Sequence, residues 1–148
     1  MEKLILDNTR DENDYYQLEI NDNGDYIEFD LTDIGLAERI MNAGDNLKKL
    51  DEQEAEEMIE IEKGTDEVLK ARKLIELASR KDKEKRKLFD SFLGEGTCDK
   101  IFGQKKNEGQ YFKLLDALEP HFKKMNLQLK KAKQKLANKY LPKDEEVM

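Results

Sequence analysis

The alternation of apolar and polar residues predicts a β-hairpin near the start of the chain. Two short alternating runs flank the turn sequence Asn21-Asp22-Asn23-Gly24-Asp25, in which Asn-Gly supplies the positive φ of a tight turn. The alternating apolar residues are Leu18 and Ile20 before the turn and Ile27, Phe29 and Leu31 after it. We therefore expect a hairpin over residues 15–31. Residues 1–14, which are polar except for Leu4-Ile5-Leu6, are interpreted as a frayed start or a further strand.

Apolar spacings of three and four residues then predict two long helices. We expect them over residues 34–62 and 67–92, joined at Gly64. Because the connection is short, the two helices should form an antiparallel helical hairpin over residues 33–93. The candidate N-caps are Thr32 or Asp33 for the first helix and Thr65 or Asp66 for the second. The apolar stripe of the second helix consists of Val68, Ala71, Ile75 and Ala78, with Leu74 and Leu77 beside it.

A connector rich in glycine and phenylalanine follows the helical hairpin. Glycine often ends a helix because it adopts positive φ, so Gly94 is predicted to end the second helix and Gly103 to end a short third one. Gly96 lies between them, and Thr97 is predicted to cap the short helix. We interpret this connector as a hinge between the helical hairpin and the rest of the chain.

The C-terminal helical region, residues 97–140, carries a continuous apolar seam. The seam consists of Tyr111, Leu115, Leu118, Phe122, Met125, Leu129, Ala132, Leu136 and Tyr140. Pro120 removes a helical hydrogen bond, so the region is either one bent helix or two helices with Pro120 in the first turn of the second. The unbroken seam favours a small bend. The candidates for binding a partner are Tyr111, Leu115, Leu118, Phe122, Met125, Leu129 and Leu136. An ordinary core helix explains the same pattern.

These elements predict a mainly α fold with a small N-terminal β-hairpin, in the α+β class. The length of the chain places residues 1–140 in a single domain. Residues 141–148, with Pro142 and an acidic run, are predicted to be a disordered tail.

Charge divides the chain into two halves. Residues 1–66 hold six Lys and Arg against 21 Asp and Glu, and residues 67–148 hold 21 against 13, so that −15 and +8 make the net charge of −7. The helical hairpin would bring the acidic segment 51–62 near the basic segment 72–80 and neutralise both. Head-to-tail association between copies is the alternative. The run SRKDKEKRK, which interrupts the apolar stripe of the second helix, is interpreted as a solvated basic turn.

Composition bounds the setting in which the protein works. Charged residues make up 41% of the chain and the mean hydropathy is −0.92, so much of the helical surface must face water. No apolar run approaches the roughly 18 residues of a membrane span. The single cysteine forms no internal disulfide, and no signal sequence follows Met1. We expect a cytoplasmic protein that does not enter a membrane.

Four clusters have the composition of a chemical site but lack its context. Cys98 and His121 are the only thiol and imidazole, and the sequence supplies no oxyanion donors for them. Gly94-Glu95-Gly96 lacks the strand and the Lys-Ser/Thr of a phosphate loop. Asp22-Asn23-Gly24-Asp25 lies between strands rather than the helices of a calcium loop, and the carboxylates of residues 51–62 lie on a solvated helix. We predict no catalytic residues, no cofactor and no metal site, and therefore a protein that is not an enzyme.

The last helix is rich in lysine. It carries Lys123, Lys124, Lys130, Lys131, Lys133, Lys135 and Lys139. Lysines neutralise phosphates, but no arginine or exposed aromatic residue is interleaved with these, and the whole chain is acidic. Nucleic acid is therefore not the partner that we expect. A regulatory or nucleic-acid-associated role through these lysines stays open as an alternative.

The order of the residues in the connector resembles that of a known family. The resemblance rests on Phe92, Gly94-x-Gly96-Thr97-Cys98-x-Lys100-Ile101-Phe102-Gly103, Tyr111, Leu114-Leu115, Leu118 and Pro120-His121. This order is similar to that in the tail assembly chaperones encoded by long-tailed phages and prophages of Gram-positive bacteria. The segment FDLTDIGLAERI, which passes from a strand into a helix, is similar as well. Together these segments cover most of the chain.

The resemblance implies a non-enzymatic role in the cytoplasm of a bacterial host. Chaperones of this family coat the long helical tape-measure protein, keep it in solution and help tail-tube subunits polymerise around it. They are then displaced and are absent from the finished virion. The implied partners are the tape-measure protein and the tail-tube protein, and a homo-oligomer is a further expectation. The family commonly makes a longer product by frameshifting, which a protein sequence does not reveal. A structural component of the virion is the remaining alternative.

Overall fold

The computed structural model describes residues 1–6, 9–107 and 109–140, with all their side chains except those at 127–129, 132, 133, 135, 136, 139 and 140. The fold is mainly helical with one small antiparallel sheet near the N-terminus, which confirms the expected α+β class. The elements are η1 (Glu12–Asp14), β1 (Tyr15–Glu19), β2 (Tyr26–Asp30), α1 (Ile34–Glu62), α2 (Glu67–Leu93), α3 (Thr97–Phe102) and α4 (Gln110–Tyr140). The tail at 141–148, predicted to be disordered, lies outside the described residues.

The predicted β-hairpin is confirmed. Strands β1 and β2 pair antiparallel, with Leu18 opposite Ile27 and Tyr16 opposite Phe29. Gly24 in the turn has φ +85°, the left-handed conformation for which glycine is suited. Ile27 and Phe29 are buried, so one face of the small sheet belongs to the core.

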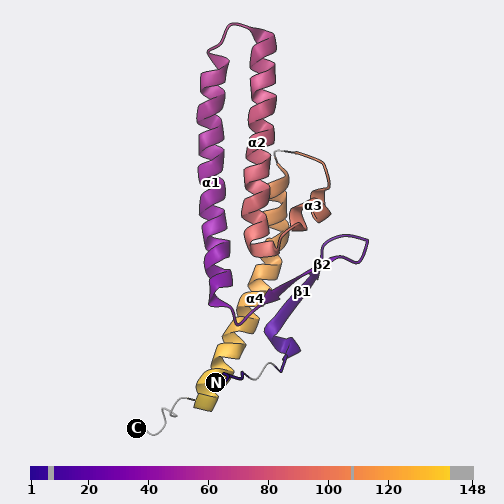
Figure 1. Ribbon diagram of the computed structural model, residues 1–148, viewed down its shortest axis with the longest axis vertical. Helices are drawn as coiled ribbons and strands as arrows, with labels where there is room; N and C mark the ends of the chain where they lie inside the picture. The colour runs from indigo at the N-terminus through magenta and orange to yellow at the C-terminus, as the bar shows by residue number, and fades with distance from the viewer. Residues whose placement is uncertain (7–8, 108, 141–148) are drawn as a thin grey trace.

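The two long helices form the predicted antiparallel hairpin, which makes up the upper part of the molecule in Figure 1. Asp33 caps α1 by accepting a hydrogen bond from the backbone N–H of Gly35, and Asp66 caps α2 in the same way through Val68 and Leu69. These caps confirm one of the two alternatives at each start. The helices therefore begin where side-chain carboxylates satisfy their first N–H groups.

Ion pairs cross from the acidic side of the hairpin to the basic side. The crossing pairs are Lys85 with Asp51 at 2.8 Å and with Glu54 at 3.6 Å, Arg80 with Glu57 at 3.0 Å, and Lys70 with Glu62 at 3.3 Å. Neutralisation within one molecule, one of the two expectations for the charge asymmetry, is therefore part of the fold.

The interpretation of SRKDKEKRK as solvated is wrong for three of its residues. The run lies within α2, inside the predicted helix, but Lys81, Asp82 and Lys85 are only 4%, 6% and 4% exposed. Lysine buries its aliphatic stem readily if its ammonium finds a partner. Here Lys81 donates to Gln53 at 3.2 Å and Lys85 pairs with Asp51, so α1 supplies the partners that permit burial.

The apolar core lies at the lower end of the helical hairpin, where α3, α4 and the sheet meet it. Phe29, Phe89, Cys98 and Tyr111 are its most completely buried side chains. Aromatic contacts join distant elements there, with ring centroids of Phe89 and Tyr111 at 5.3 Å and of Phe29 and Phe122 at 6.5 Å. The upper part of the hairpin stands clear of the rest of the described chain (Figure 1).

The C-terminal region is one helix, α4, with Pro120 inside it. Of the two arrangements expected around Pro120, the structure has the single helix. Its second half runs past the lower end of α1 and past the β-hairpin (Figure 1). We call residues 126–140 the projecting arm. Within the described part of the chain, every helix is too short or too polar to cross a membrane.

Candidate functional surfaces

The structure separates the candidate partner-binding residues of the C-terminal seam into three groups. Tyr111, Leu118 and Met125 are buried in the core of the same chain. Leu115 and Phe122 are half-buried and pack against that core. Leu129 and Leu136 belong to the projecting arm, and their side chains lie outside the described residues. The first half of the seam therefore holds α4 on its own chain.

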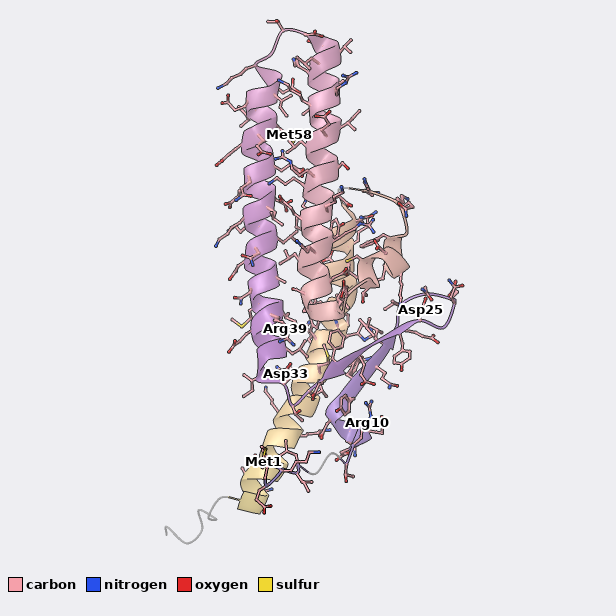
Figure 2. All side chains as sticks on the ribbon, viewed as in Figure 1. Met1, Arg10, Asp25, Asp33, Arg39 and Met58 are labelled. Carbon is pink, nitrogen blue, oxygen red and sulfur yellow. The ribbon has the colours of Figure 1, made fainter. Side chains whose placement is uncertain are left out.

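An apolar groove lies between the start of α1 and the middle of α4, and we call it the base groove. It has a volume of about 430 Å³. Its lining residues are Leu31, Asp33, Leu36, Ala37, Ile40, Met41, Phe122, Met125 and Asn126. Met41 is 71% exposed at its rim, and Figure 2 shows Asp33 at the lower end of α1. Two of the candidate residues, Phe122 and Met125, thus line this groove as well as contributing to the core.

A second apolar surface lies on the upper part of the helical hairpin, and we call it the hairpin face. It consists of Ala55, Met58 and Ile59 of α1 and Val68, Ala71, Ile75 and Ala78 of α2. Spacings of three and four residues place each set on one side of its helix. Figure 2 labels Met58, which lies on the upper part of α1. The side chain of Ile75 is 70% exposed. The stripe from Val68 to Ala78 is visible in the sequence, but its exposure is not.

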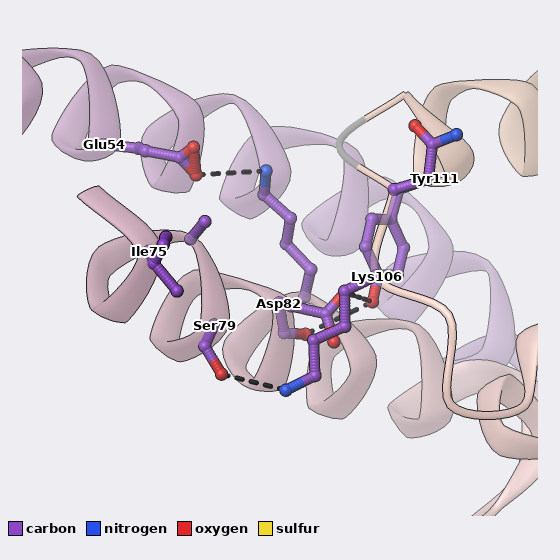
Figure 3. Close-up of a pocket in the computed structure, with 9 residues that line it drawn as sticks. Glu54, Ile75, Ser79, Asp82, Lys106 and Tyr111 are labelled. Atoms are coloured by element: carbon purple, nitrogen blue, oxygen red, sulfur yellow. Dashed lines mark hydrogen bonds and ion pairs between the residues drawn. The ribbon is translucent and has the colours of Figure 1, made fainter. Parts of the chain in front are cut away.

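A buried polar cluster joins the start of α4 to α2 (Figure 3). The carboxylate of Asp82 accepts hydrogen bonds from the Tyr111 hydroxyl at 2.7 Å, from Gln110 Nε2 at 3.3 Å and from Arg86 Nε at 2.9 Å. Burial, followed by the neighbouring Asp82 carboxylate, raises the pKa of the Tyr111 phenol well above its usual value. A raised pKa favours the protonated phenol, which donates the hydrogen bond, and the cluster holds the start of α4 against α2.

A small hollow of about 280 Å³ lies beside this cluster (Figure 3). It separates the start of α4 from the hairpin face, because Tyr111 and Asp82 line one side of it and Ile75 and Ala78 the other. Lys106 closes its edge by donating to the Ser79 hydroxyl at 2.9 Å. The hollow marks the point at which the hairpin stops being covered by α4.

Arg86 is the residue that secures the connector. Its guanidinium pairs with Asp99 of α3 at 2.7 Å and donates to the carbonyls of Gly103 at 2.9 Å and Lys105 at 2.7 Å. One rigid fork thus holds α3 and the following loop against α2. Sequence reasoning missed Arg86 because it lies in the run that was interpreted as solvated.

The predicted caps in the connector are confirmed in part. Gly94 (φ +114°) ends α2 and Gly103 (φ +62°) ends α3, each with its N–H bonded to the preceding turn. Thr97 does not cap α3. The N-cap residue is Gly96, which has no side chain to offer, and the Thr97 hydroxyl instead donates to the Leu93 carbonyl at 3.2 Å. The cap is replaced by Asp90 of α2, whose carboxylate accepts from the N–H groups of Gly96 and Cys98.

Cys98 and His121 have different partners. Cys98 is fully buried, its thiol lies 3.7 Å from the Arg86 carbonyl, and burial raises its pKa above the usual range. A nucleophilic cysteine needs the opposite shift. His121 Nδ1 lies 2.6 Å from the hydroxyl of Tyr16 in β1. Both residues thus hold neighbouring elements together in this structure.

Charged side chains form no cluster suited to a cation in the described part of the chain. There, no three His, Cys, Asp or Glu residues come together as metal ligands would.

Of the lysines on α4, the described side chains of Lys123, Lys124, Lys130 and Lys131 are exposed. Lys133, Lys135 and Lys139 have side chains outside the described set.

The comparisons with known proteins place the chain in a family. A family model described as "Family of unknown function (DUF6673)" matches residues 23–146, which is most of the chain. No curated protein and no solved structure matches it. The matched span includes the second strand, both long helices, the connector and all of α4.

Proposed function

This chain belongs to the family of unknown function DUF6673, and we propose that it is a tail assembly chaperone of a long-tailed phage or prophage that binds helical segments of the tape-measure protein. The base groove is the observation that supports this proposal. A tape-measure chain exposes long apolar helical stripes before assembly, and an open groove lined by Leu, Ile, Phe and Met suits one face of such a helix. Tail-tube subunits would then polymerise on a tape-measure protein kept in solution.

The chemistry of the groove fits reversible binding. Methionine is flexible and polarisable, so Met41 and Met125 adapt to side chains of different shapes. Burying about 400 Å² of apolar surface per copy contributes about 10 kcal/mol before the cost of association. Many copies along one tape-measure chain would therefore coat it and still be displaced by tail-tube subunits. This role requires no catalytic residue.

Co-expression tests the proposal directly. A tape-measure protein expressed together with this chain should move from the insoluble to the soluble fraction and co-purify with the chain. Met41→Asp places a charge at the rim of the base groove and should reduce the recovered tape-measure protein by about tenfold, the equivalent of 1.4 kcal/mol. Leu69→Asp, at an exposed apolar residue outside both surfaces, is the matched control and should leave recovery unchanged. No rescue and no co-purification would contradict the proposal.

The exposed lysines of α4 favour one alternative, a nucleic-acid-associated or regulatory phage protein. That function predicts salt-sensitive binding to DNA or RNA that is lost when Lys130 and Lys131 become Glu. A structural role in the virion predicts that the chain is found in purified particles by mass spectrometry, whereas a chaperone is absent from them.

A further inference from the structure

We propose that the chain self-associates head to tail, with the projecting arm of one copy bound on the hairpin face of the next. This interface joins the arm to the hairpin face, whereas the base groove shares only Asn126 with it, and the inference does not rest on the proposed function. The argument uses three observations: the place that α4 occupies on its own hairpin, the charges of the two surfaces, and their lengths.

The hairpin face is continuous with the surface of α1 and α2 against which α4 packs. Asp82 and Phe89 of α2 contact Tyr111 of α4, and the stripe that contains them continues upward through Ala78 and Ile75. On α1, Ala55 lines a hollow with Phe112 of α4, and the next residues on that side of the helix are Met58 and Ile59. The upper hairpin thus offers the position of a third helix, which no described part of the same chain fills.

Small residues make this face suitable for a helix. Ala55, Ala71 and Ala78 allow a helical backbone to approach closely, and Met58 and Ile75 offer larger apolar contacts. The arm has a matching apolar seam in its sequence, at Leu129, Ala132 and Leu136. A helix that continued in the line of α4 would bury this seam against the hairpin face.

Charge selects the arm as the occupant. Residues 51–62 of α1 contain seven Asp and Glu and no Lys or Arg, whereas residues 121–140 of α4 contain seven Lys and no Asp or Glu. Ion pairs within the hairpin use several of these carboxylates. The side chains of Glu52 and Glu56 remain exposed and form no ion pair or side-chain hydrogen bond within the described ranges, and Lys130 and Lys131 are exposed on the arm. The arm thus brings positive charge to the most acidic edge of the molecule.

The lengths of the two surfaces also agree. The part of α2 that precedes the contact between Asp82 and Tyr111, residues 67–81, and the arm, residues 126–140, each have 15 residues and a length of about 22 Å. An arm lying parallel to the α4 of the receiving copy would end near the start of that helix. Because the arm and the hairpin face are different surfaces, the contact is heterologous and leaves a free arm and a free face at the two ends of each assembly.

Two variants that each lose one surface test the geometry. Ile75→Glu adds a charge at an exposed position of the hairpin face, and the double variant Lys130→Glu, Lys131→Glu reverses charge on the arm. The wild-type chain should show a mass that rises with concentration in sedimentation experiments and falls as NaCl increases from about 0.05 to about 0.5 M. Each variant alone should stay monomeric over the same range.

A mixture of the two variants gives the decisive result. Its members still hold one intact arm and one intact face between them, so an equimolar mixture should form a 1:1 dimer and nothing larger. Lys73→Glu, an exposed change elsewhere on α2, should associate like the wild type. A wild-type chain that is monomeric at all concentrations, or a mixture that fails to pair, would overturn the proposal. Neither result would affect rescue of the tape-measure protein, which depends on the base groove.

Discussion

The hydroxyl of Tyr111, at the start of α4, donates a 2.7 Å hydrogen bond to the buried carboxylate of Asp82 in the middle of α2. This bond fixes the height at which α4 begins on the hairpin. It therefore determines how much of the hairpin α4 covers and how far the arm projects at the other end.

Tyr111→Phe keeps the ring in the core and removes only the donor. We expect the free energy of unfolding to fall by about 1–2 kcal/mol, because a hydrogen bond to a buried charged group is lost while Gln110 and Arg86 still serve Asp82. Urea unfolding followed by circular dichroism measures the change. Tyr26→Phe is the control, since Tyr26 is 58% exposed, and it should change stability by less than about 0.5 kcal/mol. Equal effects of the two variants would contradict the role of the bond.

The ion pairs of the hairpin should contribute different amounts to the free energy of unfolding, according to how deeply each is buried. Lys85, with a side chain only 5% exposed, lies 2.8 Å from Asp51. Lys85→Met keeps the apolar stem but removes the ammonium from a buried site, and we expect a loss of about 3 kcal/mol. Arg80→Met breaks the exposed pair with Glu57 and should cost about 0–1 kcal/mol. The urea midpoints of the two variants measure the two losses of stability. Equal losses for Arg80→Met and Lys85→Met would contradict the prediction.

Cys98 should be unreactive in the folded chain. Burial raises the pKa of its thiol, so the folded state disfavours the thiolate that reacts with labelling reagents. We expect a thiol reagent at pH 8 to label the native protein far more slowly than the protein in urea. Rapid labelling of the native chain, together with its loss in His121→Ala, would instead support an enzyme that uses Cys98.

Two exposed ion pairs should make the stability of the folded state depend on pH in the acid range. Hydrogen bonds from Arg10 lower the pKa of Glu28, and those from Arg39 lower the pKa of Asp33, relative to the usual values of 4.5 and 3.8. A lowered folded-state pKa contributes stability above the unfolded-state value, and this contribution is lost as pH falls through the folded-state value. The melting temperature should therefore fall below about pH 4.5. Glu28→Gln should have a shallower fall, and an unchanged slope would show that this pair contributes nothing.

Local chemistry made much of the fold predictable. Asp33 and Asp66 cap their helices, and Gly94 and Gly103 end theirs. Each of these residues bonds to groups within the adjacent helical turn, so the local sequence is enough to predict it. The burial of Lys85 could not be predicted in the same way, since its partner Asp51 lies on another helix. The cap of α3 failed for a similar reason: Asp90 of α2 accepts from the N–H groups of Gly96 and Cys98, so a residue on another helix caps α3 in place of Thr97.

The candidate surfaces were harder to predict than the helices. An apolar seam has the same pattern whether it meets its own chain or a partner, and the structure buries Tyr111 and Leu118 of the seam in the core. The stripe containing Ile75 has the pattern of a buried helix, yet it is exposed. The difference depends on the relative lengths of α2 and α4 and on where Tyr111 meets Asp82, neither of which appears in a local pattern.

The same substitution at two glycines should have opposite effects on stability. Gly96 has φ +81°, and an added Cβ would meet no heavy atom within 4 Å, so the strain of Gly96→Ala comes from the backbone alone. An L-residue in the left-handed region costs about 1–2 kcal/mol. Gly44 lies within α1 with equally open space and no positive φ, so Gly44→Ala should stabilise the chain by about 0.5–1 kcal/mol.

Urea unfolding of both variants measures these two changes, and near-ultraviolet circular dichroism reports the aromatic contacts around Tyr111. Because Gly96 lies in the connector between α2 and α4, a bulkier replacement there should also shift α4 and weaken the binding of a partner. Gly44→Ala should leave binding unchanged. If Gly96→Ala were neutral and bulky replacements bound the tape-measure protein normally, the connector would not act as a hinge that sets the position of α4.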